Sequence, residues 1–247
     1  MCNQKNAQGP LICMFDSGIG GLNLLRACVH RLPQADFCYF ADNYNVPYGN
    51  LGEREIKRRV FGIFEKIAAL HPDAAVVACN TVTTECITDL RAAFRFPIIG
   101  VEPAVKQAAL CGDNFLVLAT EATCGSASFK KLMSQYGAVA DVRPMSRLAE
   151  EIEQNIFSLD GDALAAGLPR GNFSSVVLGC THYVFIEKAI KKLYCCPVFD
   201  GMLGTADHLA ATLGKFDHMT SRMGKIAFFC GDFAKNKAVF DKINQSY

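Results

Sequence analysis

Two segments whose cysteines lie 101 residues apart share one pattern: a short apolar run ends in a cysteine that hydrogen-bonding side chains follow. The first segment is AAVVACNT, Ala74 to Thr81, and the second is SSVVLGCTH, Ser174 to His182. Short runs of small and β-branched residues predict buried strands of a parallel sheet. Open α/β sheets bind ligands at the carboxyl ends of their strands. We therefore expect Cys79 and Cys180 to lie at a functional site.

The spacing of these segments recurs along the chain. Corresponding strand positions in the two halves lie 100 to 104 residues apart: Asp16 and Thr120, Cys79 and Cys180, Pro97 and Pro197. A nearly constant offset indicates an internal repeat, and strands that alternate with helical segments are typical of a doubly wound α/β sheet. We predict an α/β fold of two similar doubly wound lobes related by a pseudo-twofold, with the active site in the cleft between them. The first lobe would comprise residues 1–97 and 210–247, and the second residues 98–209.

A glycine-rich loop, Ser17 to Gly21, follows the first predicted strand and precedes a helical segment. Backbone N–H groups at Gly18 to Gly21 would open that helix and could bind a carboxylate. The loop lacks the dinucleotide-binding fingerprint, because Asn23 stands where GxGxxG has its third glycine. Asp16, at the end of the strand, either caps the helix or takes part in chemistry, and both roles are compatible.

The composition narrows the class of protein. With 25 basic and 24 acidic side chains the net charge is +1, so no strong field favours nucleic acid or an anionic membrane as a partner. Met1 to Pro10 lacks the apolar core of a signal peptide, and no apolar run reaches the length of a membrane span. We therefore predict a cytoplasmic protein whose 12 cysteines are mostly reduced. They form neither a CxxC pair nor a zinc-type cluster, so no metal is expected.

Two thiols on opposite faces of one carbon can invert its configuration, because a thiolate removes a proton from one face and a thiol returns one from the other. The neighbouring side chains fit a small amino acid as the substrate. Neutral groups able to hold its carboxylate and amino group are Ser17, Asn80, Thr81 and Thr181. Candidates for assisting the thiols are Asp16, Glu151 and His182. No lysine stands in a pyridoxal context and no phosphate loop occurs, so no cofactor is expected.

The chain resembles the aspartate/glutamate racemase family, and glutamate racemases in particular. Five motifs in the family's order carry the resemblance: FDSGIGG (Phe15 to Gly21), VPYG (Val46 to Gly49), ACNT (Ala78 to Thr81), GVEP (Gly100 to Pro103) and GCTH (Gly179 to His182). Each motif alone is a weak signal, but together they extend over most of the chain from Leu11 to Asp200.

The resemblance implies a racemase without cofactor or metal that interconverts L- and D-glutamate, supplies D-glutamate for bacterial peptidoglycan and forms a homodimer. In the family the first-lobe cysteine, here Cys79, deprotonates D-glutamate, and the second-lobe cysteine, here Cys180, deprotonates L-glutamate. Asp16 and His182 match residues thought to assist the thiols, and Glu151 matches a third through a looser alignment. The positions that match substrate-contacting residues are Asp16, Ser17, Tyr48, Gly49, Asn80, Thr81, Thr181 and His182.

Other interpretations remain open at this level. Glu151 lies in an acidic run with Glu150 and Glu153, for which a solvated helix face is the ordinary explanation. Tyr48 could be a packing aromatic whose backbone, not its ring, meets the ligand. The residues that bind the groups around the α-carbon do not distinguish side chains of different length, so an aspartate racemase is an alternative. A non-catalytic amino-acid-binding relative and a thiol redox protein are further alternatives.

Overall fold

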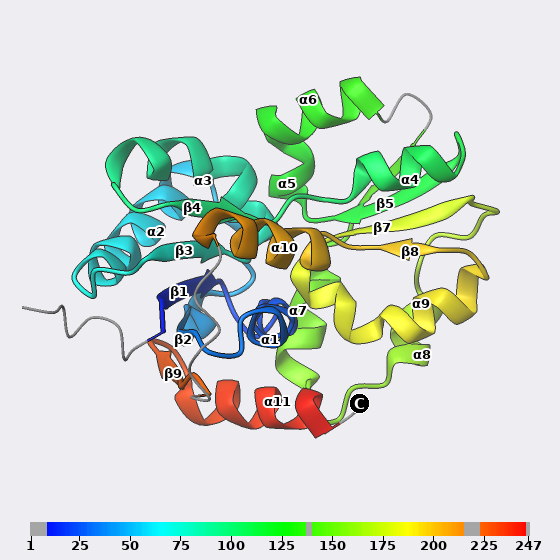
Figure 1. The fold of residues 1–247 in the computed structure, drawn as a ribbon. Coiled ribbons are helices and arrows are strands. Elements are labelled where there is room, and N and C mark those ends of the chain that lie inside the picture. Colours follow the sequence, from blue (N-terminus) through cyan, green and yellow to red (C-terminus); the bar gives the residue numbers. More distant parts are fainter. Residues whose placement is uncertain (1–8, 137–139, 215–222, 246–247) are drawn as a thin grey trace, which may run out of the picture.

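The computed structural model describes residues 9–136, 140–214 and 223–245, which form two α/β lobes side by side (Figure 1). Within these residues, each lobe is built on one sheet in which every strand pairing is parallel. In sheet order, the first sheet contains β4 (Ile98–Gly100), β3 (Ala74–Val77), β1 (Leu11–Asp16), β2 (Asp36–Ala41) and β9 (Ile226–Phe229). The second contains β6 (Asp141–Pro144), β5 (Phe115–Ala119), β7 (Ser175–Gly179) and β8 (Val198–Phe199).

The two sheets share one strand order. The order β4-β3-β1-β2 of the first sheet becomes β8-β7-β5-β6 when each strand is replaced by its counterpart in the second half. Strand β9 extends the first sheet only, where it pairs with β2. The matching order explains the offset of the sequence pattern, because corresponding strands occupy corresponding places. The predicted α/β fold of two similar lobes is thereby confirmed.

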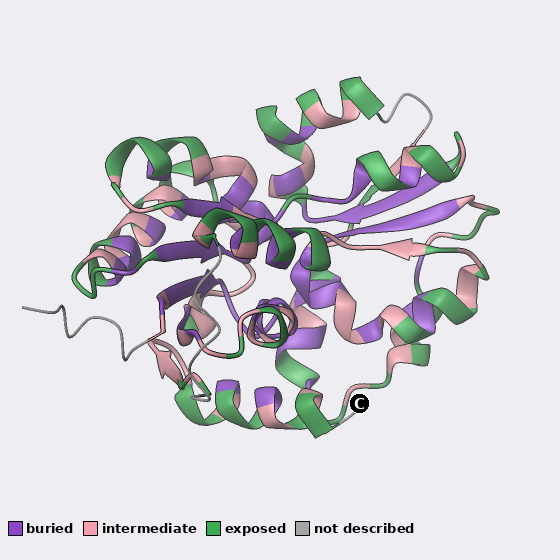
Figure 2. Ribbon diagram, in the orientation of Figure 1, coloured by how far each residue is buried: buried purple, intermediate pink, exposed green. Residues whose placement is uncertain are grey.

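Helices cover both faces of the first sheet because its strands are apolar on both faces (Figure 2). Along β1, Ile12 and Met14 pack into one core cluster, and Cys13 and Phe15 into another. The helices that cover this face of the first sheet and join the first cluster are α1 (Leu22–Arg31), α10 (Met202–Leu213) and α11 (Phe233–Gln245). Those of the second cluster are α2 (Glu53–Ala68) and α3 (Asn80–Ala93). Two short 3-10 helices, η2 (Asn43–Asn45) and η3 (Tyr48–Asn50), connect β2 to α2.

The second sheet is covered in the same way. Phe115 and Val117 of β5 pack with residues of α4 and α6, whereas Leu116 and Leu118 join the core cluster that includes α7 and α9. That cluster also contains Ile12 and Met14 of the first lobe, so a continuous core joins the lobes. The helices are α4 (Val105–Cys111), α5 (Glu121–Gly125), α6 (Ala127–Tyr136), α7 (Ser146–Asn155), α8 (Gly161–Ala166), η4 (Thr181–Ile186) and α9 (Glu187–Tyr194).

Two features depart from the sequence expectations. Strand β6 was not anticipated, because its four residues, DVRP, include one valine and a proline and lie at a sheet edge. The expected second lobe, residues 98–209, also begins and ends with segments of the first lobe. Ile98–Gly100 pairs with β3, and α10, which starts at Met202, packs against α1. By sheet membership and packing, the first lobe extends to Gly100 and resumes at Met202.

Candidate active site

The carboxyl ends of β1, β3, β5 and β7 meet between the lobes, and the residues that follow these strands line a small cavity with a volume of about 10 Å³. Both Cys79 and Cys180 lie in its wall. The other lining residues are Ser17, Pro47, Tyr48, Gly49, Asn80, Thr81, Thr120, Ala149, Thr181 and His182. Of the sequence-predicted site residues, the cavity lining thus lacks only Asp16 and Glu151.

The two thiols have corresponding positions in their lobes. Cys79 caps the N-terminus of α3 in an extended conformation, and Cys180 precedes η4, also in an extended conformation. Both are buried. Each sulfur has a different polar neighbour: Oγ of Ser17 lies 3.7 Å from Sγ of Cys79, and Nδ1 of His182 lies 3.9 Å from Sγ of Cys180. The two cysteines therefore have similar backbone conformations, but the side chains beside their sulfurs differ chemically.

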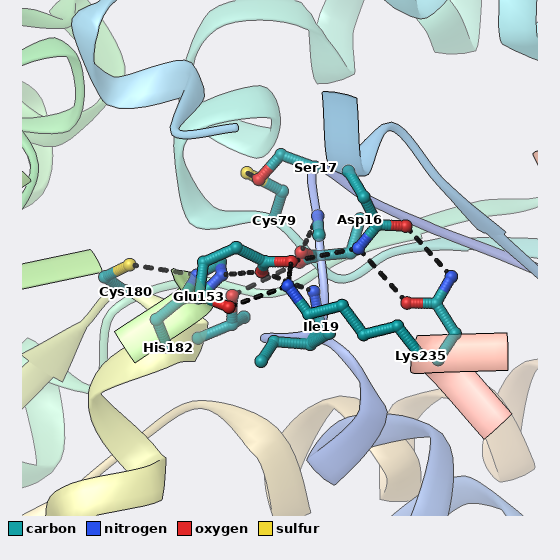
Figure 3. A network of polar contacts seen from close by, with 12 residues as sticks. Asp16, Ser17, Ile19, Cys79, Glu153, Cys180, His182 and Lys235 are labelled. Carbon is teal, nitrogen blue, oxygen red and sulfur yellow. Dashed lines mark hydrogen bonds and ion pairs between the residues drawn. The ribbon is translucent and has the colours of Figure 1, made fainter. Parts of the chain in front are cut away.

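A buried glutamate, Glu153 of α7, lies behind His182 (Figure 3). Its Oε2 is 2.7 Å from Nε2 of His182, and the two side chains are 3% and 2% exposed. A buried charge is costly unless it has a partner of opposite charge, so Glu153 and His182 stabilise each other as a pair. Glu153, His182 and Cys180 thus form a chain of polar contacts that ends at the second thiol.

Glu151 does not reach the site, which corrects the sequence prediction. Its side chain is 38% exposed and binds Arg147 at 3.0 Å on the outer surface of α7. Residues two apart lie about 200° apart around a helix axis, so Glu151 and Glu153 face opposite directions. The signal that could have separated them is the spacing of Leu148, Ala149 and Ile152, whose buried face includes Glu153.

The glycine loop binds carboxylates of the protein itself. The Gly18 amide donates to Oδ1 of Asp16 at 2.9 Å, and the Ile19 amide donates to Oε2 of Glu153 at 2.9 Å. The expectation that the amides of Gly18 to Gly21 bind an external carboxylate is therefore wrong for Gly18 and Ile19, because carboxylates of the protein already occupy these two. Asp16 is fully buried behind the cavity, where its Oδ2 accepts a hydrogen bond from Thr181 at 3.2 Å.

Burial and neighbouring charges set the protonation states. Burial raises the pKa of Cys79 to about 12, and the negative charge of Asp16 adds to this shift. Burial likewise raises the pKa of Asp16 to about 6. Burial alone would lower the pKa of His182, but hydrogen bonds to Cys180 and Glu153 raise it to about 10. Burial alone would raise the pKa of Glu153, but hydrogen bonds with His182, Ile19 and Lys235 lower it to about 2.

At neutral pH these shifts give Glu153 a negative charge, His182 a positive charge and Cys79 a proton. An imidazolium 3.9 Å from Sγ of Cys180 stabilises negative charge on that sulfur. Cys79 is therefore placed as a proton donor, and the Cys180 sulfur lies beside a positive charge.

Two other predicted residues have defined orientations. The Tyr48 hydroxyl donates to Oδ2 of Asp42 at 2.7 Å and its ring packs on Phe15, so both ends of the ring are held by the first lobe. Oδ1 of Asn80, by contrast, is buried without a hydrogen-bond partner in the described structure. An unpaired acceptor beside the cavity suits a donor such as an ammonium group.

One threonine of the second lobe, Thr120, was missed as a site residue. Thr120 lines the cavity, and its Oγ1 lies 2.9 Å from Oγ1 of both Thr81 and Thr123. Thr120 is also the N-cap of α5 and accepts from the Thr123 amide. The sequence contained a signal, because Thr120 occupies the strand-end position that corresponds to Asp16.

A larger groove of about 790 Å³ lies elsewhere, between α1, α9 and α11, and neither site cysteine lines it. The chemistry described above therefore belongs to the smaller cavity. In the parts of the chain that the structure describes, no group of three histidine, cysteine or acidic side chains has an arrangement suited to a metal ion. Among the same residues, no helix is both long and apolar enough to span a membrane.

A pair of thiols between two repeated α/β lobes places the chain among the amino-acid racemases, and comparison with known proteins supports this class. A family model described as Asp/Glu/Hydantoin racemase matches residues 22–209. A curated glutamate racemase of Clostridium botulinum is 38% identical, over 82% of this chain and 83% of its own length. The chain belongs to the Asp/Glu/Hydantoin racemase family.

Solved structures agree with this assignment. Escherichia coli glutamate racemase, in complex with L-glutamate and the activator UDP-MurNAc-Ala, superposes with a TM-score of 0.80 at 26% identity. The match covers 97% of this chain and 95% of that chain. Glutamate racemase from Thermus thermophilus, in complex with β-chloro-D-alanine, gives a TM-score of 0.79 at 28% identity and covers 97% of this chain and 94% of that one.

Proposed function

We propose that this racemase interconverts L- and D-glutamate by direct proton transfer between the α-carbon and two thiols. One observation carries the proposal: Cys79 and Cys180 enter one cavity from corresponding strand ends of the two lobes. A substrate carbon held between them presents one face to each sulfur, so removal and return of a proton from opposite sides inverts it.

In the direction from L- to D-glutamate, the Cys180 thiolate removes the α-proton and Cys79 gives its proton to the opposite face. The products are D-glutamate, a protonated Cys180 and a Cys79 thiolate. This state serves the reverse reaction, in which Cys79 is the base. The imidazolium of His182 stabilises the Cys180 thiolate, and Glu153 takes the role that sequence reasoning gave to Glu151.

Polar groups around the cavity hold the substrate. Oδ1 of Asn80 would accept from the ammonium group, and the hydroxyls of Thr81 and Thr120 are placed to donate to a carboxylate. Asp16 acts from behind the cavity, through its contact with Thr181 and its charge near Cys79. The remaining contacts come from Ser17, Tyr48, Gly49, Thr181 and His182.

The cavity volume of about 10 Å³ corresponds to space for about one water molecule, which is far less than an amino acid needs. The lobes must therefore separate to admit the substrate and close on it. Contacts across the cleft that would break include Thr81 with Thr120 and Asp16 with Thr181. Closure excludes water from the carbanion between the thiols.

Glutamate is preferred over aspartate as the substrate because the 38% identical relative is a glutamate racemase. The E. coli racemase also binds L-glutamate in its structure. The test is a racemisation assay on purified protein with both enantiomers of glutamate and aspartate, followed by chiral chromatography. We expect turnover of both glutamate enantiomers, with one solvent deuterium gained at Cα in deuterated water. Faster turnover of aspartate, or inversion without deuterium, would contradict the proposal.

The resemblance also predicts a cytoplasmic homodimer that supplies D-glutamate for peptidoglycan. Light scattering of the purified protein tests the dimer. Growth of a D-glutamate-requiring bacterium that expresses the chain tests the cellular role.

A further inference from the structure

The C-terminal helix contacts the site from behind. Lys235 of α11 places Nζ 2.8 Å from Oε1 of Glu153 and 2.7 Å from the carbonyl oxygen of the same residue (Figure 3). Its side chain is 21% exposed. The ammonium thus binds the carboxylate oxygen that His182 does not use, and it joins the end of the chain to the polar network of the second thiol.

The Glu153 carboxylate accepts four hydrogen bonds. Oε1 accepts from Lys235 at 2.8 Å and from Nδ2 of Asn43 at 3.0 Å. Oε2 accepts from the Ile19 amide at 2.9 Å and lies 2.7 Å from His182. Three of these donors belong to the first lobe, although Glu153 and His182 belong to the second. The first lobe therefore fixes the carboxylate that orients the histidine.

Lys235 is itself held in place. Its amide donates to Oδ1 of Asp232 at 2.9 Å, and the next residue, Asn236, exchanges hydrogen bonds with Asn43 at 3.0 and 3.1 Å. The preceding turn needs glycine, because Gly231 has φ +62° and a Cβ there would lie 2.4 Å from Oδ1 of Asn43. The turn that starts α11 is thus built against the donors of Glu153.

We propose that Lys235 is a positioning residue for the second thiol: it fixes the Glu153 carboxylate, which in turn orients His182 beside Cys180. This inference rests on the proposed two-thiol function. A purely structural role, in which Lys235 only ties α11 to α7, makes a different prediction, because it leaves the ionisation of the thiols unchanged.

The charge of Lys235 gives the proposal a measurable signature. The titratable groups around the Glu153–His182 pair are Asp16 of β1, Tyr39 of β2, Cys79 after β3, Cys180 after β7 and Lys235 of α11. Lys235 is a cation within this otherwise mainly acidic set. Its removal makes the surroundings more negative, so a thiolate forms at a higher pH. The acidic limb of the profile of kcat/KM against pH should therefore move to higher pH.

Both reaction directions must show the same profile. L- and D-glutamate have equal free energy, so kcat/KM is equal in the two directions at every pH. The limb in kcat/KM consequently reports ionisation of the thiol pair as a unit and not of either sulfur alone.

The experiment compares Lys235→Met, Lys235→Gln and Lys235→Arg with wild type. The matched control is Lys237→Met, because Lys237 lies two residues further on α11, is 66% exposed and pairs with Asp241. We expect Lys235→Met and Lys235→Gln to lower kcat/KM about 10- to 100-fold, as loss of precise positioning does. Both should move the acidic limb of the kcat/KM profile to higher pH by roughly 0.5 to 1 pH unit. In Lys235→Arg the acidic limb should return to its wild-type pH, and Lys237→Met should match wild type in both kcat/KM and the position of the limb.

Thermal unfolding of every variant separates folding from chemistry. A lowered melting temperature with an unmoved limb in Lys235→Met and Lys235→Gln would overturn the inference in favour of a structural role. If Lys235→Met does not fold, the comparison of Lys235→Gln with Lys235→Arg decides in the same way. Absence of glutamate racemisation by the wild-type protein would overturn the proposed function as well, whereas an unmoved limb in an active variant overturns only the role of Lys235.

Discussion

Glu153 and His182 form an ion pair that is almost completely buried, with Oε2 2.7 Å from Nε2 and both side chains at most 3% exposed. A buried pair of this kind is strongly destabilised when one partner is removed, because the other charge remains without compensation. The same pair stands behind the Cys180 thiol. Stability and chemistry therefore depend on the same contact.

Replacing Glu153 by glutamine tests this dependence directly. We expect Glu153→Gln to lower the free energy of unfolding by about 3 to 5 kcal/mol, because His182 and Lys235 lose their common counter-ion. The rate of glutamate racemisation should fall as well. Glu151→Gln on the same helix is the control and should stay within about 0.5 kcal/mol of wild type, since its partner is an exposed arginine. Urea unfolding and the glutamate assay measure both effects, and equal effects of the two variants would contradict the site as described.

Each thiol is expected to be indispensable for inversion. Cys79→Ser and Cys180→Ser should each reduce racemisation by about 100-fold or more, because a serine hydroxyl is a poor general acid or base at neutral pH. The remaining thiol can still remove a proton from one enantiomer, so exchange of the α-hydrogen with deuterated solvent should persist for that enantiomer alone. Proton NMR of each enantiomer measures this exchange. Wild-type-like racemisation by either variant would exclude the two-thiol mechanism.

The pH dependence of unfolding follows from the shifted pKa values. The pKa of Glu153 falls from 4.5 to about 2 on folding, so its contribution is complete above pH 4.5 and is lost as the pH falls towards 2. The pKa of His182 rises from 6.5 to about 10, so its contribution is complete below pH 6.5 and is lost as the pH rises through 10. The raised pKa of Asp16 works in the same direction as that of His182, with its contribution lost as the pH rises from 3.8 through about 6.

We therefore expect the free energy of unfolding to be greatest near pH 4, where the gain from Glu153 gives way to the loss from Asp16, and to decline on both sides. His182→Asn should flatten the decline between pH 6.5 and 9, below the range in which the raised pKa of Cys79 contributes, whereas the exposed His208→Asn should leave it unchanged. Urea titrations at a series of pH values measure the curve. A decline between pH 6.5 and 9 that persists in His182→Asn would show that another group causes it.

Gly20 tests how tightly the glycine loop fits the second lobe. A Cβ there would lie 2.2 Å from Oγ1 of Thr181 and 2.8 Å from Nδ1 of His182. Gly20→Ala should therefore displace both side chains and lower kcat/KM by about 100-fold. At Gly62 of α2 a Cβ meets nothing within 4 Å, so Gly62→Ala should retain activity and stabilise the fold by about 0.5 to 1 kcal/mol. Thermal melts and the racemisation assay compare the two.

Thr120 combines two roles that substitution can separate. Thr120→Val removes both its hydroxyl at the cavity and the cap of the Thr123 amide, which costs about 1 kcal/mol of stability. If the hydroxyl also binds a substrate carboxylate, KM should rise roughly 10-fold or more, as loss of a hydrogen bond to a charged group implies. Thr120→Ser keeps the hydroxyl and should remain near wild type in both measurements. An unchanged KM in Thr120→Val would remove Thr120 from the substrate site.

Much of the fold and part of the site follow from local sequence. Cys79 and Cys180 could be paired from sequence because parallel strands bring their carboxyl ends to one edge, and a repeat offset identifies corresponding strands. The same logic pointed to Asp16 and would have pointed to Thr120. Strand β6 escaped detection because a short edge strand does not need the apolar pattern of a buried one.

The motifs did not separate Glu151 from Glu153. The apolar spacing of α7 could have indicated that Glu153 faces inward, but not which residues it contacts. Only tertiary packing supplied those contacts: Glu153 is surrounded by Ile19, Asn43, His182 and Lys235, which lie between 29 and 134 residues away along the chain. No local pattern reports contacts over such separations. 

The sequence by itself determined the two repeated α/β lobes, the pair of thiols at their strand ends and a net charge close to zero, because these follow from periodicity, offset and composition. The tertiary structure alone decided which partners the buried glutamate has, that the glycine-loop amides bind Asp16 and Glu153, and that Lys235 reaches the site from the C-terminal helix. The physical reason is that a buried charge is stable only where distant segments supply its partners, and only the folded chain brings those segments together.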